Sequence, residues 1–236
     1  MINKRVLKAA FTVSLPVLMG YMAMGMAAGI LLAKTTDIGG VSFWAFVTSS
    51  INISGALQFL IADWAKNMTP MTQVILLTLC LNLRYALYGF SLLERFKKAS
   101  LPVRLYLIWA LTDETYAIQV ANKVPEGEDG ISYCLAVAAF DHLYWVAGVV
   151  TGAVIGSSLP FDCRGIDFAM TALFLVILTD QCRAKYNRLP ALIGAGAALI
   201  SRGFLDTGNM LLCAIPLMVC ALILLQYAAG KEKADA

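Results

Sequence analysis

An unbroken stretch without charged side chains, from Ala9 to Ala33, limits what this chain can fold into more than any other feature. A membrane-spanning helix needs about 20 apolar residues, whereas the apolar part of a cleaved signal peptide has only about 7–15. The basic residues Lys4, Arg5 and Lys8 precede the stretch, which fits both a membrane-spanning helix and a signal peptide. Its length predicts an uncleaved first transmembrane helix.

Similar apolar stretches with few charges follow along the chain. They cover 38–62, 67–93, 105–122, 131–158, 166–181, 189–205 and 207–230. Only 14% of the 236 residues are charged, against roughly 25% in a soluble domain. Lipid offers the backbone no hydrogen-bond partner, and continuous apolar runs indicate helices rather than alternating strands. We predict one all-α transmembrane domain over 1–230, with about seven or eight hydrophobic segments, and a polar cytoplasmic tail over 231–236.

Basic residues in short loops favour the cytoplasmic side of a membrane. They form three clusters here: Lys4, Arg5 and Lys8; Arg95, Lys97, Lys98 and Arg104; and Arg183, Lys185 and Arg188. All three clusters and the N-terminus face the cytoplasm if 38–62 and 166–181 enter the membrane and return on the same side. The acidic loop Glu126–Asp129 then faces out. If every segment crosses instead, the second cluster faces the wrong side.

The two halves of the chain also resemble one another weakly. Gly25 and Gly29 precede a helix with Arg84, and a glycine stripe at 148, 152 and 156 precedes a helix with Arg202. With one crossing over 105–122 between them, the halves would have opposite orientations. That is the inverted-repeat plan of many secondary transporters, whose helices are broken at mid-membrane. The alternative is seven or eight full spans with one loop against the charge rule.

Charged residues inside the apolar stretches need a reason, because each costs about 2.5–3.5 kcal/mol at the bilayer centre. Arg84, beside Asn82, can bind a substrate carboxylate through two parallel hydrogen bonds, or it can snorkel to the interface or pair with an internal acid. Asp113 and Glu114 lie about 100° apart on a helix and cannot share one face. They are candidates for binding an ion or relaying a proton, or for an ion pair with Arg84 or Arg202.

Two more groups of polar residues are candidates for a site. Ser54, Gly55 and Gln58 suit an interrupted helix, whose freed amides and carbonyls can bind a zwitterion; the alternative is helix packing through small residues. Asp141 and Trp145 lie at the top of the glycine stripe. Asp141 is a further candidate for proton or ion coupling and Trp145 for substrate binding. The alternative is a packing face with an interfacial Trp anchor.

The same sequence disfavours several other classes of protein. It holds no nucleophile elbow, phosphate loop or zinc motif, a single histidine (His142), and six cysteines without a CxxC pair. We expect no catalytic residues, metal, cofactor or nucleic-acid partner. A channel, an intramembrane enzyme and a transporter of another amino or organic acid remain as alternatives.

These features together resemble the AzlC family of branched-chain amino-acid permeases. The resemblance rests on the glycines of the first helix, Ser54 to Phe59, Asn82 to Tyr85 followed by Gly89, Thr112 to Glu114, the stripe of Trp145, Gly148, Gly152 and Gly156, and Gly165 to Ala169. It implies a bacterial inner-membrane protein that works with a small AzlD-type membrane subunit. It also implies proton-driven export of leucine, valine, isoleucine and often methionine. The family supplies no site residues to carry over.

Overall fold

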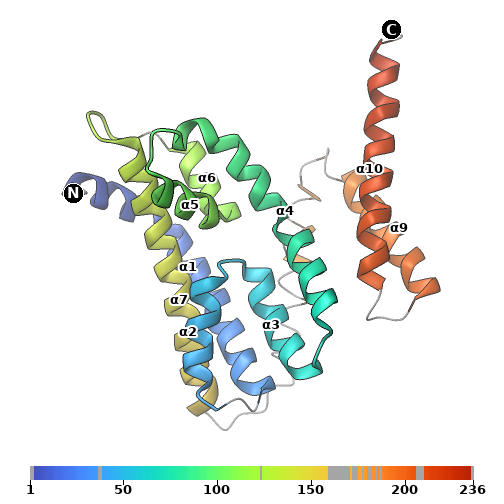
Figure 1. Cartoon of the computed structure of the whole chain (residues 1–236), viewed down its shortest axis with the longest axis horizontal. Coiled ribbons are helices and arrows are strands. Elements are labelled where there is room, and N and C mark those ends of the chain that lie inside the picture. The colour runs from blue at the N-terminus through green and yellow to red at the C-terminus, as the bar shows by residue number, and fades with distance from the viewer. Residues whose placement is uncertain are drawn as a thin grey trace. The chain divides into compact units, whose positions relative to one another are not determined.

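The computed structural model describes residues 3–36, 39–122, 124–158, 171, 175–176, 178–179, 182–183, 185, 188–205 and 210–234, and in these ranges the chain is helical without strands (Figure 1). The chain forms two compact units. The first comprises Met1–Thr69 and Leu81–Asp167, and the second Pro70–Cys80 and Phe168–Ala236. The prediction of an all-α membrane protein is confirmed. Within the described ranges three helices are long and apolar enough to cross a membrane, namely α1 (Lys4–Thr35), α4 (Met71–Phe96) and α7 (Gly130–Ser158).

The first unit is built on two long helices, α1 (Lys4–Thr35) and α7 (Gly130–Ser158), which lie side by side and run in the same direction (Figure 1). Near their starts, Asn3 Nδ2 donates to Glu128 Oε1 at 2.8 Å. Further along, Ser14 Oγ and Tyr144 Oη share a hydrogen bond of 3.3 Å. The two helices are therefore parallel, because residue numbers rise in the same direction along both.

Glycine makes the close approach of α1 and α7 possible. A Cβ added at Gly148 would lie 2.7 Å from the carbonyl oxygen of Tyr21, and one at Gly25 would lie 3.0 Å from the amide nitrogen of Val149. Both neighbours are backbone atoms, which cannot move aside as a flexible side chain can. The packing interpretation of the glycine stripe is thereby confirmed.

The segment predicted over 38–62 is interrupted, as its small polar residues suggested. Helix α2 (Val41–Ile51) ends, residues 52–54 are extended, and α3 (Gly55–Asn67) begins. With 11 and 13 residues at about 1.5 Å each, the two helices reach roughly half of a ~30 Å hydrocarbon core. Gln58 Nε2 donates to Thr48 Oγ1 across the break, so α2 and α3 form a hairpin, which we call the first hairpin.

The segment 105–122 was predicted as one crossing, and this is wrong. Helix α5 (Leu101–Trp109) ends before Ala110, and α6 (Asp113–Ala121) begins after Thr112, so these helices form a second hairpin. Local chemistry explains the break. The Thr112 side chain accepts a hydrogen bond of 3.1 Å from the Thr115 N–H and so caps α6. The negative charges of Asp113 and Glu114 in the first turn also stabilise the positive N-terminal end of this helix.

Helix α4 (Met71–Phe96) runs alongside α6 in the same direction in its second half. Tyr88 Oη donates to Asp113 Oδ1 at 2.8 Å and Ser91 Oγ to Tyr116 Oη at 3.2 Å, while the Arg95 guanidinium donates to the carbonyl of Gln119. The partners keep almost the same spacing along both helices. The end of α4 therefore lies beside the end of α6.

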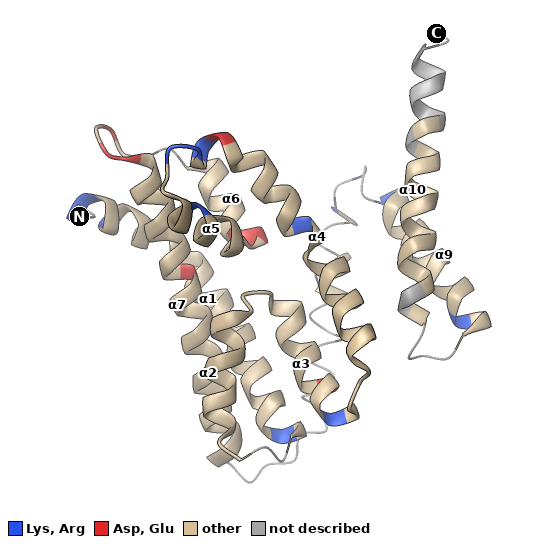
Figure 2. Cartoon of the chain, viewed as in Figure 1, with Lys and Arg blue, Asp and Glu red and all other residues tan. Residues whose placement is uncertain are grey.

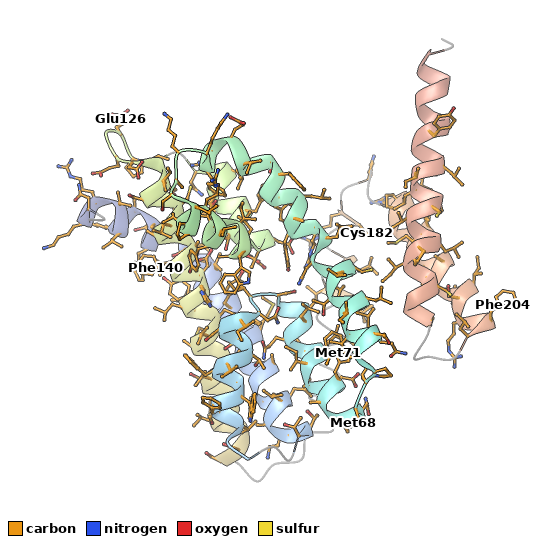
Figure 3. All side chains as sticks on the ribbon, viewed as in Figure 1. Met68, Met71, Glu126, Phe140, Cys182 and Phe204 are labelled. Atoms are coloured by element: carbon orange, nitrogen blue, oxygen red, sulfur yellow. The ribbon has the colours of Figure 1, made fainter. Side chains whose placement is uncertain are left out.

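These directions correct the predicted orientation of the halves. Because α1 and α7 are parallel, the acidic loop before α7, with Glu126 at its tip, lies at the same end of the first unit as the basic N-terminus and the charged end of α4 (Figures 2 and 3). The sequence predicts opposite orientations for the glycine helices, with this loop facing away from the N-terminus, and this prediction is wrong. The order hairpin then long helix occurs twice instead, as α2–α4 and as α5–α7, and the two hairpins enter from opposite ends (Figure 1).

The second unit contains α9 (Arg188–Phe204) and α10 (Met210–Ala234), which extends past residue 230. The two helices pack together, and a Cβ at Gly194 would lie 3.3 Å from Met218 Sδ. Arg202 donates to the carbonyl of Leu205 at 3.3 Å. Most of 166–181 lies outside the described residues, so its predicted return to the same side of the membrane stays a prediction.

Candidate functional site at the two helix breaks

The breaks of both hairpins lie near the middle of α1 and α7. Trp145 Nε1 on α7 donates to the carbonyl of Asn52 in the first break at 3.2 Å. Tyr21 Oη on α1 is 2.6 Å from Thr112 Oγ1 in the second break. Helices that enter from opposite ends thus expose their termini at one level. Each break places a helix C-terminus, with free carbonyls, beside a helix N-terminus, with free amides.

A cavity of about 230 Å³ lies between the two breaks and α4. Its walls are Ile51, Asn52, Ile53, Ser54, Asn82, Tyr85, Ala86, Ile108, Trp109 and Leu111. Ligand pockets for drug-sized molecules span roughly 300–1,000 Å³ and are mainly apolar with a few polar groups. This cavity has the same character at a smaller size, which suits a small amphipathic molecule.

Two amide oxygens, one in the cavity wall and one in the first hairpin, are buried without a partner among the described residues. Asn82 Oδ1 is one of them and belongs to the cavity wall. The other is Oε1 of Gln58, which is fully buried one turn into α3 and whose Nε2 donates to Thr48. A buried polar atom without a hydrogen bond costs about 1–3 kcal/mol. Such atoms mark places where a ligand or water can supply the missing bond.

Arg84 and Asp113 form an ion pair across α4 and α6, with Nη1 and Oδ2 2.8 Å apart. Arg84 Nη2 also donates to Tyr85 Oη at 2.9 Å, and Tyr88 Oη donates to Asp113 Oδ1. Both charged side chains are more than a third exposed, so the pair is accessible from outside the packed core. This arrangement is the ion pair with an internal acid that the sequence offered as an alternative for Arg84. Neither residue lines the cavity, but Arg84 precedes Tyr85 and Asp113 follows shortly after Leu111, which both do.

Asp141 lies in the middle of α7 and is 1% exposed. Its Oδ2 accepts a hydrogen bond of 2.7 Å from Thr115 Oγ1 on α6, and its Oδ1 has no partner among the described residues. Glu114, half-buried, accepts from Tyr21 Oη at 2.9 Å through Oε2. The adjacent acids Asp113 and Glu114 therefore point to different partners, as their helical spacing predicted.

Trp145 is 1% exposed, so an interfacial anchor is not its role. Its ring packs edge-on against Tyr21, with centroids 5.6 Å apart. A Cβ on Gly55 would lie 3.6 Å from its Cη2 atom. Trp145 thus joins the first hairpin to the residues around the second break.

The structure brings the predicted site residues into one region but gives them different surroundings. Ser54 and Asn82 line the cavity, Gly55, Gln58 and Trp145 lie behind the first break, and Arg84 pairs with Asp113. Sequence reasoning missed Tyr21, Trp109 and Thr115, and it singled out Tyr85 and Thr112 only as parts of the family resemblance, without a role in the site. A threonine before two acids is a helix-start signal, and it could have revealed the second break. Among the described residues no three His, Cys, Asp or Glu side chains lie close enough together to hold a metal.

Broken helices that meet between long membrane helices, around a small cavity with a few polar groups, define a class of protein. The arrangement is that of a helical membrane transporter.

Comparison with known proteins gives the family. The AzlC protein family matches residues 16–159. The branched-chain amino acid transport protein AzlC of Bacillus subtilis is 31% identical over 97% of this chain and 87% of its own length. An uncharacterized membrane protein of Helicobacter pylori strain J99 is 34% identical over 92% of this chain and 93% of its own. The inner membrane protein YgaZ of Escherichia coli is 28% identical over 79% and 78%.

The chain belongs to the AzlC family, and it is a membrane transport protein. No solved structure matches it.

Proposed function

We propose that this protein exports leucine, valine, isoleucine and methionine across the bacterial inner membrane, driven by protons, together with a small AzlD-type subunit. The cavity between the two helix breaks carries the proposal. The name of the Bacillus subtilis relative supports branched-chain amino acids as substrates, and that of the Escherichia coli relative supports the inner membrane. The basic residues Lys4, Arg5 and Lys8 support a cytoplasmic N-terminus. Export, proton coupling and the small subunit follow from the family resemblance.

The cavity suits a zwitterion with an apolar side chain. Ile53, Ile108 and Leu111 offer an apolar wall for the side chain. The free amides at the start of α3, beside Ser54, suit the carboxylate, while the carbonyl ends of α2 and α5 and the Asn82 amide oxygen suit the ammonium. Apolar contacts discriminate by only about 1–3 kcal/mol per methylene, so several aliphatic amino acids fit one site.

The charged residues have a second role in this proposal. Asp113 holds Arg84 in the ion pair, and breaking the pair would release the guanidinium for the substrate carboxylate. Glu114 and Asp141 then hold the exchanged proton near the second break. Arg84→Ala and Asp113→Ala should each abolish transport while the protein still folds. The double variant Arg84→Ala/Asp113→Ala distinguishes a structural role of the ion pair from a role in transport. If the pair is only structural, the double variant should regain transport because no unpaired charge remains. If the two residues act in transport, the double variant should stay inactive.

The test is efflux from bacterial cells preloaded with a leucine- or methionine-containing dipeptide. Cells carry the protein with the neighbouring small-subunit gene, the protein alone, or neither. We expect fast release of the free amino acid only with both genes, and its loss when a protonophore is added. Equal release in all three, with both subunits in the membrane, would refute branched-chain export.

A matched pair of variants on α4 tests the cavity. Ala86 lines it, whereas the neighbouring Leu87 does not and is 60% exposed. Ala86→Trp fills the cavity and should abolish efflux, and Leu87→Trp should leave efflux near the wild-type rate. Equal rates for the two variants would place the substrate path elsewhere.

A further inference from the structure

A chain of hydroxyl groups joins the two acids around the second break. Glu114 Oε2 accepts from Tyr21 Oη at 2.9 Å, and Tyr21 Oη lies 2.6 Å from Thr112 Oγ1. Thr112 Oγ1 lies 3.1 Å from Thr115 Oγ1, which lies 2.7 Å from Asp141 Oδ2. Every step is within hydrogen-bond distance, so the chain is continuous from one carboxyl group to the other.

We propose that Tyr21, Thr112 and Thr115 form a relay that carries one proton between Glu114 and Asp141. This inference rests on the proposed proton-driven export and specifies its proton path.

The proton balance of the relay closes without any further reactant. With Glu114 protonated and Asp141 ionised, each hydroxyl group donates toward Asp141. Transfer breaks one O–H bond and forms one at every hydroxyl group, so Thr115 gives its proton to Asp141 while Tyr21 receives one from Glu114. Afterwards Asp141 is neutral, Glu114 is ionised, and each hydroxyl group donates in the reverse direction. The reset is the same sequence run backwards.

The two ends of the relay differ in their exposure. Glu114 is half-buried, whereas Asp141 is 1% exposed. The groups that interact with Asp141 are Tyr21 from α1, Tyr106 from α5, and Thr115 and Glu114 from α6. His142, the next residue on α7, lies with Nδ1 3.3 Å from Tyr106 Oη. Among the described residues no basic side chain forms an ion pair with Asp141. An isolated ionised carboxylate is costly away from water, so this position favours arrival of a proton.

Two members of the relay lie close to the cavity without lining it. Thr112 follows Leu111, which lines the cavity, and the Tyr21 ring packs on Trp145, which holds the Asn52 carbonyl of the first break. A change in hydroxyl direction at Thr112 or Tyr21 thus acts next to both breaks. Proton transfer is thereby linked to the proposed substrate site through Leu111, Trp145 and Asn52.

The test measures protonation of Asp141 directly, without any amino acid present. The purified full-length protein is subjected to a pH jump, and infrared difference spectroscopy follows the protonated-carboxyl band that Asp141→Asn removes. Thr115→Val keeps the side-chain shape but removes the hydroxyl group, so the band should respond slower by about tenfold or more. Thr115→Ser, which restores the hydroxyl group, should respond at the wild-type rate.

Tyr21→Phe is the second test of the relay, and Tyr144→Phe is its matched control. Tyr144 is also a buried tyrosine that bonds across the α1–α7 pair, to Ser14, but it lies outside the hydroxyl chain. We expect slowing in Tyr21→Phe only. Wild-type rates in both Thr115→Val and Tyr21→Phe, or a wild-type protein without a band that Asp141→Asn removes, would overturn the relay.

A transport readout keeps this result separate from the proposed function. In membrane vesicles with both subunits, Thr115→Val should lose leucine movement driven by a pH gradient but keep leucine counterflow, which needs no net proton transfer. Undiminished gradient-driven movement in Thr115→Val would contradict the relay. Absence of leucine counterflow in the wild type would refute the proposed substrate, while the pH-jump rates still decide the relay.

Discussion

Replacement of Gly152 by alanine should destabilise the α1–α7 pair, and the structure sets the size of the effect. The added Cβ would lie 2.6 Å from Met26 Cα and 2.7 Å from its carbonyl carbon. Carbon atoms in contact prefer about 3.5–4.0 Å, so the helices must separate by about 1 Å at this point. Overpacking of this kind costs typically ~1–3 kcal/mol.

Gly20→Ala is the matched control on the same helix pair. A Cβ there meets nothing within 4 Å, and alanine favours a helix by about 0.8–1.0 kcal/mol over glycine. The same chemical change is therefore expected to destabilise the protein at 152 and to be neutral or stabilising at 20.

Thermal unfolding of the purified variants in detergent, followed by tryptophan fluorescence, measures the difference. At about 2–4 °C per kcal/mol for a chain of this size, a ~2 kcal/mol loss lowers the Tm of Gly152→Ala by about 4–8 °C. Gly20→Ala should keep or raise the wild-type Tm. An unchanged Tm for Gly152→Ala would refute the close parallel packing of α1 and α7.

Two further predictions concern the loop before α7. Asp129 Oδ2 accepts hydrogen bonds of 2.8 Å from the Ser132 hydroxyl and amide, and these bonds lower the pKa of the Asp129 carboxyl group. A lowered folded-state pKa contributes stability above the unfolded pKa that is lost as pH falls through the folded value. Asp129→Ala removes this cap of α7 and should therefore lower the Tm at pH 7, by an amount corresponding to about 0.5–2 kcal/mol. The difference in Tm from the wild type should shrink below about pH 4. A difference in Tm that does not change with pH would contradict the capping role of Asp129. In membrane topology mapping, cysteines introduced at Leu7 and Glu126 should react with an impermeant thiol reagent from the same side of the membrane. A cysteine at Met68, which is 85% exposed at the end of α3, should react from the other side. Labelling of Leu7 and Glu126 from opposite sides would restore the orientation predicted from charge.

Much of the site could be predicted from single residues, because polar groups inside apolar stretches are costly and stand out. Asn82, Arg84, Asp113 and Asp141 were found in this way, and the pairing of Arg84 with Asp113 was one of the stated alternatives. Their division into a cavity, an ion pair and a hydroxyl chain could not be predicted. That division depends on which helix faces each side chain, and hydroxyl groups such as Thr115 carry no hydropathy signal.

The sequence by itself determined that this chain is a helical membrane protein and that one helix breaks near Ser54, where small polar residues interrupt an apolar run. It did not reveal the second break, because Trp109, Ala110 and Leu111 keep that run apolar while Thr112 starts a new helix. Only the tertiary structure decided the parallel course of α1 and α7. The direction of each helix depends on whether the segments before it cross the membrane or return to the same side. Contacts between residues distant in the sequence decide this, such as those of Trp145 with Asn52 and of Tyr21 with Thr112.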